Sequence, residues 1–197
     1  MLGFAAALVL ILGTPGPGVL SLAAVGSAFG VREGLIYGTG LFFGSNLVMA
    51  AAASGLAVLL EANPALRVVF VALSSGYLLW LAWRVARAGG TVGFGEAREA
   101  PGFWGAILLQ VANPKAYAVG TFIFAFPLAL EGAAEVAAKF AVLNAIWVPI
   151  HLAWLWLGAT LRRLDLALAT QRAINRAMAG ALVAVVLIAA FSTLRGP

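Results

Sequence analysis

Polar groups that could carry chemistry gather at two proline-rich points of this sequence. The first is Thr14-Pro15-Gly16-Pro17 and the second is Asn113-Pro114-Lys115. Proline lacks an N–H and clashes with the carbonyl one turn earlier, so each point leaves backbone groups that hydrocarbon cannot satisfy. A helix restarting at such a break directs free N–H groups and a positive dipole end toward a carboxylate. The alternative interpretation is a tightly packed kink.

Two titratable side chains lie deep in hydrophobic runs. Lys115 stands about twelve residues into its run, and charges inside a membrane are functional by default. It could pair with an anionic substrate group or take part in ion coupling, unless it reaches back to the interface. His151 is the single histidine and could relay protons. A neutral, hydrogen-bonding core histidine is the competing interpretation.

Amide side chains complete the predicted substrate site. Asn46 lies 31 residues after Pro15, and Asn144 lies 30 residues after Pro114. Together with Asn113 they are predicted to bind substrate, whereas other mid-run polar residues such as Gln110 could simply hold helices together. No acidic residue lies deep in a run, so a strongly cationic substrate would lack a buried counter-ion.

The elements that must position these groups are hydrophobic helices. Of the 197 residues, 63% are hydrophobic and 10% charged, and the mean hydropathy is +1.04, whereas soluble domains carry roughly 25% charged residues. The runs lack the alternation of a membrane β-barrel, so the fold class is an all-α integral membrane protein. A bilayer helix needs roughly 20 apolar residues, and six runs qualify: about 2–27, 34–60, 65–86, 103–128, 134–160 and 175–194.

Several partners and functions are excluded or left open by composition. There is no cysteine, so thiol redox chemistry and thiolate metal sites are excluded. The net charge of +5 comes from arginines that flank hydrophobic runs, which argues against nucleic acid. No cofactor and no metal are expected. Glycines at 26, 30, 34 and 38, and at 40 and 44, would permit close helix packing or a homodimer face.

The basic residues predict the orientation. The first basic residue is Arg32, so the N-terminal run is interpreted as the first span rather than as a cleaved signal peptide. By the positive-inside rule the side with more basic residues is cytoplasmic, which places both termini in the periplasm. Eight basic residues fall on one side (Arg32, Arg84, Arg87, Arg98, Arg162, Arg163, Arg172, Arg176) and three on the other (Arg67, Lys139, Arg195).

The chain divides into two similar halves. Residues 1–88 and 103–197 each contain three predicted spans, and 89–102 form a cytoplasmic linker in a connection rich in glycine and charge. An odd number of spans gives the halves opposite orientations. The first and fourth helices are both broken at similar depth, which is typical of inverted-repeat transporters with a substrate site near the midplane. Chance similarity between sequences rich in Ala and Leu is the alternative.

These landmarks resemble the LysE/RhtB family of bacterial amino-acid exporters. The resemblance spans nearly the whole chain and implies export of amino acids or related metabolites across the bacterial inner membrane, with the proton gradient as the usual energy source. It rests on Thr14 to Pro17, on Gly34, Gly40 and Gly44, on Gly76-Tyr77-Leu78, on Asn113 to Ala116 and on Pro127.

Two positions depart from the family pattern. Gly18 stands where Asn or Asp commonly follows the first break, and Leu128 stands where Gln often follows the proline. The expected function is therefore secondary export of an amino acid or similar carboxylate, with the exact substrate open. Transport of an ion or another solute and a non-catalytic membrane scaffold remain the alternatives. An enzyme is not expected, because HExxH, GxSxG and paired intramembrane aspartates are missing.

Overall fold

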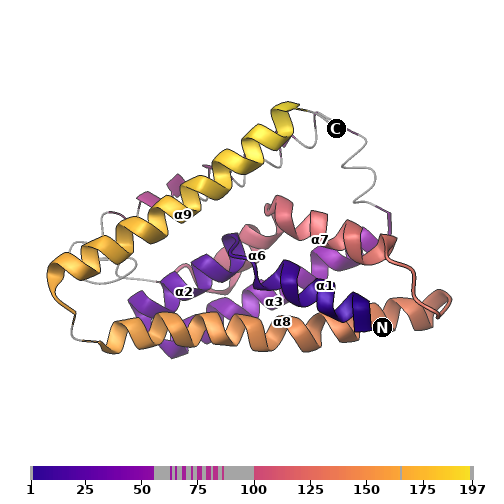
Figure 1. The fold of residues 1–197 in the computed structure, drawn as a ribbon, viewed down its shortest axis with the longest axis horizontal. Coiled ribbons are helices and arrows are strands. Elements are labelled where there is room, and N and C mark those ends of the chain that lie inside the picture. Colours follow the sequence, from indigo (N-terminus) through magenta and orange to yellow (C-terminus); the bar gives the residue numbers. More distant parts are fainter. Residues whose placement is uncertain are drawn as a thin grey trace.

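The computed structural model describes residues 2–55, 100–164 and 166–195, together with isolated positions between 63 and 86. The elements in the continuous ranges are all helical (Figure 1). They are α1 (Leu2–Gly13), α2 (Pro17–Phe29), α3 (Val31–Ala53), α6 (Gly102–Val111), α7 (Pro114–Ala125), α8 (Gly132–Arg163) and α9 (Leu168–Arg195).

The first predicted run is broken as expected. The Thr14 side chain bonds back to the carbonyls of Leu10 and Ile11, at 3.1 and 2.6 Å, and closes α1. Pro17 then opens α2, since a missing N–H is harmless at the first helical position. The two helices meet at an angle of 53°. With 12 and 13 residues, neither reaches across a bilayer alone, but together they make one candidate span.

The fourth predicted run is broken as well. Helix α6 ends at Val111 and α7 begins at Pro114. Asn113 caps α7, because its Oδ1 accepts the backbone N–H of Lys115 at 3.0 Å. The sequence therefore specifies this break twice, by a proline at the first position and by an asparagine cap.

Two described helices are long and apolar enough to cross a membrane alone, α3 with 23 residues and α8, whose candidate span covers Gly132–Leu161. The predicted run 65–86 lies largely outside the described residues. The predicted ends shift elsewhere: α9 begins at Leu168 rather than near 175, so Arg172 and Arg176 lie in a helix and not in a loop. Lys139, counted as a residue of the outer side, lies within α8 and is buried.

Close packing around α8 organises the described helices. In Figure 1, α8 runs along the molecule with α1 and α2 beside it, and α9 turns back at an angle. Helix α2 packs on α8, and α3 packs on α6. A Cβ on Gly26 or Gly34 would overlap Leu155 of α8, and one on Gly40 would overlap the backbone of Phe103 in α6. The predicted packing role of these glycines is confirmed.

Candidate functional site

The two helix breaks, 101 residues apart, meet through Lys115. Its Nζ donates a hydrogen bond of 2.7 Å to the Thr14 carbonyl and lies 3.3 Å from Thr14 Oγ1. The side chain lies across Gly16, where an added Cβ would stand 2.9 Å from Lys115 Cδ. The carbonyl end of α1 attracts the ammonium, because helix C-termini carry partial negative charge.

The start of α2 offers free backbone donors. Its cap residue, Gly16, is extended and supplies no side-chain bond. The first helical bond runs from the Leu20 N–H to the Gly16 carbonyl, so the N–H groups of Gly18 and Val19 have no acceptor within the helix. Both residues line a cavity. A positive helix end therefore faces this cavity.

A buried chain of amides forms the opposite wall. Asn113 Nδ2 donates to Gln110 Oε1 at 2.9 Å, and Gln110 Nε2 donates to Ser45 Oγ. Gln110 is only 5% exposed, and Asn113 is buried as well. These bonds tie the second break to α3 and fix the orientation of each amide.

His151 borders the same cavity from α8. Its Nδ1 lies 2.8 Å from the Trp147 carbonyl, and its ring stacks on that of Trp147 at 3.5 Å between centroids. Because a carbonyl only accepts, Nδ1 carries a proton. In the neutral ring, Nε2 is then an acceptor.

The polar cavity enclosed by these groups is small. Its volume is about 60 Å³, which holds a few water molecules. None of its lining residues is acidic, and Lys115 is the charged one among them. The lining comprises Leu12, Gly18, Val19, Ser45, Met49, Gln110, Asn113, Lys115, Ala116, Val119, Leu143, Trp147 and His151.

A second, apolar pocket adjoins the polar cavity. Trp147 and His151 line both, and the pocket continues between α2, α3 and α8 past Leu22, Phe42 and Leu155. Its volume is about 290 Å³. The aromatic wall of α8 therefore separates a polar compartment from an apolar one.

Asn46 and Asn144 pair with each other instead of lining the cavity. Asn46 Nδ2 donates to Asn144 Oδ1 at 3.1 Å, and Asn144 Nδ2 donates to Asn46 Oδ1 at 2.9 Å. This reciprocal pair joins α3 to α8 and uses the amide groups on both sides. Their predicted role in substrate binding has no support from this arrangement.

The remaining predicted site residues divide into two groups. Asn113, Lys115 and His151 line the cavity. Thr14 and Gly16 contact Lys115, whereas Pro15, Pro17 and Pro114 shape the breaks without lining the cavity. The predicted site omitted Gly18, Ser45, Gln110 and Trp147. A usable signal existed for Gln110, which lies three residues before Asn113 on the same helix face.

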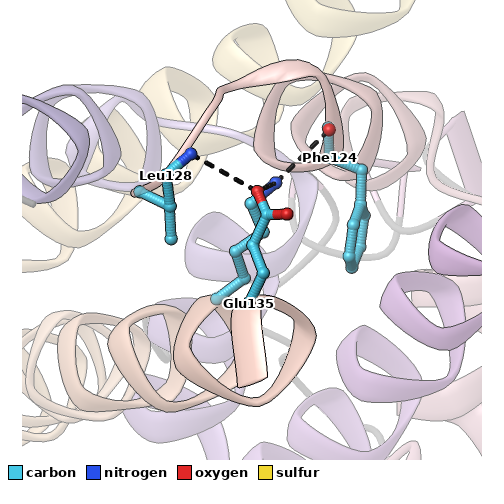
Figure 2. Close-up of polar contacts among 4 residues, drawn as sticks. Phe124, Leu128 and Glu135 are labelled. Carbon is cyan, nitrogen blue, oxygen red and sulfur yellow. Dashed lines mark hydrogen bonds and ion pairs between the residues drawn. The ribbon is translucent and has the colours of Figure 1, made fainter. Parts of the chain in front are cut away.

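A buried ion pair, which the sequence analysis also missed, joins α7 to α8 (Figure 2). Glu135 Oε1 lies 2.8 Å from Lys139 Nζ and accepts the Leu128 N–H at 3.3 Å. Lys139 is 3% exposed and donates to the Phe124 carbonyl at 3.3 Å. The spacing of four residues is the sequence signal for such a pair.

Two broken apolar helices that meet at a polar cavity are typical of membrane transporters. No group of three His, Cys, Asp or Glu side chains in the described part of the chain could hold a metal. The chain belongs to the LysE family, since the model of the LysE type translocator matches residues 9–194. The resemblance read from the sequence is confirmed, and a translocator family agrees with a protein that is not an enzyme.

Curated relatives are efflux proteins. A leucine efflux protein of Klebsiella pneumoniae is 34% identical over 113 residues, which cover 55% of this chain and 53% of the relative. A leucine efflux protein of Enterobacter sp. (strain 638) is 32% identical over 52% of this chain and 51% of its own. A cysteine/O-acetylserine efflux protein of Klebsiella pneumoniae is 30% identical over 80% of this chain and 81% of its own.

The chain thus spans about half the length of the leucine efflux proteins that it matches. No solved structure matches it significantly.

Proposed function

We propose that this protein is a secondary transporter that exports neutral amino acids across the bacterial inner membrane. The observation that carries the proposal is the meeting of the two helix breaks at a cavity bordered by Lys115. Family membership and the efflux relatives support amino acids as the substrate class.

The carboxylate of the substrate binds where positive charge converges. Lys115 supplies an ammonium, and the uncapped start of α2 supplies the N–H groups of Gly18 and Val19. Substrate binding replaces the Thr14 carbonyl as the partner of Lys115. Because Thr14 is the last polar group of the first break, this exchange couples the substrate to the angle between α1 and α2.

The side chain of the substrate is apolar or small. No acidic residue lines the polar cavity in the described structure, so lysine and arginine side chains would find no counter-ion. The cavity itself is too small for a large amino acid, and the adjoining apolar pocket past Trp147 offers the additional room. Movement of the aromatic wall would join the two.

We further propose six spans arranged as two inverted repeats, residues 1–88 and 103–197, with both termini in the periplasm. The matching breaks and the Asn46–Asn144 pair, whose members follow their prolines by 31 and 30 residues, support this arrangement. C-terminal fusions test the orientation: a reporter active only in the periplasm should be active, and activity of a cytoplasmic reporter would contradict it.

Proton coupling is proposed to pass through His151 or Lys115. These are the titratable residues that line the polar cavity. A proton arriving at His151 Nε2 would turn an acceptor into a donor. Substrate and proton would then occupy the cavity alternately, as an antiporter requires.

The direct test is transport by purified protein in proteoliposomes. Vesicles loaded with each radiolabelled neutral, acidic or basic amino acid are diluted into a buffer that imposes a pH gradient. We expect release of neutral amino acids, accelerated by the gradient. Release of inorganic ions or unrelated solutes, with no amino acid released, would favour the alternative transport function and overturn the proposal.

A further inference from the structure

Two hydrogen-bond acceptors border the space left by the missing side chain of Gly18. A Cβ at this position would lie 3.3 Å from Gln110 Oε1 and 3.7 Å from His151 Nε2. All three residues line the polar cavity. The two acceptors therefore face one point of the cavity from α6 and α8.

The orientation of the Gln110 amide follows from its neighbours. The backbone N–H of Lys115 can only donate, so the Asn113 atom that accepts it is Oδ1. Asn113 must then donate through Nδ2, and its partner on Gln110 is the oxygen. An amide oxygen accepts two hydrogen bonds, and Asn113 uses one. Gln110 Oε1 keeps a lone pair for a donor in the cavity.

His151 is fixed in a similar way. Its Nδ1–H is held by the Trp147 carbonyl at 2.8 Å, and the ring is stacked on Trp147. His151 is 6% exposed, so the ring has little freedom to turn. Nε2 of the neutral ring is an acceptor held beside Gly18.

We propose that Gln110 Oε1 and His151 Nε2 bind the α-ammonium group of the transported amino acid. The inference rests on the proposed amino-acid export and assigns the second half of the same site. The α-carboxylate and α-ammonium are separated by one carbon, and the structure places their binding groups on either side of Gly18: Lys115 and the start of α2 for one, these acceptors for the other.

Neutral acceptors suit a transported ammonium. A carboxylate in this cavity would pair with Lys115 and compete with the substrate for it. Neutral oxygen and nitrogen acceptors stabilise the ammonium without that competition. Glycine at position 18 is needed because any larger side chain would fill the space that the ammonium occupies.

The test compares amino acids with their analogues that lack the ammonium. Two probe pairs are used, L-leucine with 4-methylpentanoate and L-alanine with propanoate, and their affinities for the purified protein in nanodiscs are measured. Wild-type protein should bind the amino acid at least about tenfold more tightly, since a hydrogen bond to a charged group contributes roughly 1.5–3 kcal/mol.

The decisive variant is Gln110→Met, which keeps the shape and removes the acceptor. We expect amino-acid affinity to fall about tenfold while the affinity for the ammonium-free analogue stays within about threefold, so that discrimination collapses. Gln110→Glu should instead increase discrimination. Ser27→Ala is the matched control, because Ser27 is a buried polar residue of α2 outside the cavity lining. Should Gln110→Met fail to fold, His151→Phe keeps an aromatic ring beside Trp147 and removes Nε2.

The outcomes separate this inference from the proposed function. If wild-type protein binds and exports neither amino acid, both proposals fail. If it exports amino acids but Gln110→Met and His151→Phe weaken both members of each probe pair equally, export stands and the ammonium site is wrong. Loss of discrimination confined to the amino acid supports it.

Discussion

Asn46 and Asn144 form a reciprocal amide pair, with two hydrogen bonds of 3.1 and 2.9 Å between α3 and α8. The two residues hold equivalent places after the two helix breaks. A pair of this kind satisfies both amides at once, so removing either partner leaves the other with an unpaired donor and acceptor.

A double-mutant cycle on this pair should show strong coupling. Asn46→Ala and Asn144→Ala should each lower stability by roughly 0.6–1.7 kcal/mol, the range for interhelical polar contacts in a bilayer, and the double variant should cost little more than one single variant. Thermal unfolding in detergent measures the cycle. Strictly additive effects would show that the pair contributes nothing as a unit.

Helix α8 approaches α2 through Gly158. A Cβ here would overlap the backbone of Ala23, which cannot turn aside as a side chain can. Gly158→Ala should therefore destabilise the protein by about 1–3 kcal/mol, measured as a lower melting temperature. Gly180→Ala is the control, because nothing lies within 4 Å of a Cβ at that position of α9. It should be neutral or slightly stabilising, and equal losses in the two variants would refute the packing argument.

The Glu135–Lys139 pair fastens the end of α7 to α8. Glu135→Gln leaves Lys139 charged and buried, so it should destabilise by roughly 1–3 kcal/mol. The double variant with Lys139→Met should recover much of that loss, because no charge then remains buried. Unfolding in detergent provides the measurement. A double variant less stable than Glu135→Gln would show that Lys139 contributes mainly through its bond to Phe124.

The sequence predicts the breaks better than the contacts between them. Proline chemistry is local, so Pro17 and Pro114 mark the starts of α2 and α7 without any knowledge of the fold. The partner of Lys115 is 101 residues distant, and no local pattern shows that a backbone carbonyl of Thr14 accepts its proton. The predicted depth of Lys115 was therefore sound, while its position between the two breaks required the structure.

Amide residues show the same limit. Asn46, Asn113 and Asn144 are equivalent as residue types at mid-run depth, and all three were predicted to bind substrate. Only Asn113 lines the cavity, because the other two pair across α3 and α8. Which amides satisfy one another depends on helix packing, and a single sequence does not record that packing.

His151 provides a test of coupling. His151→Gln keeps a hydrogen-bonding side chain but does not titrate, so if His151 carries the proton, transport should lose its dependence on pH between about 5 and 8. Lys115 is the other titratable residue lining the cavity. Initial rates of amino-acid release are measured across this range. An unchanged pH profile would assign the proton to a residue other than His151.

Lys115→Met tests the central claim most directly. Methionine keeps much of the apolar stem and removes the ammonium that joins the two breaks. Export of L-leucine or L-alanine from proteoliposomes should fall at least about tenfold while membrane insertion and melting temperature stay close to those of the wild type. Export at the wild-type rate at every pH tested would contradict the account, because Lys115 would then neither bind the carboxylate nor couple the breaks.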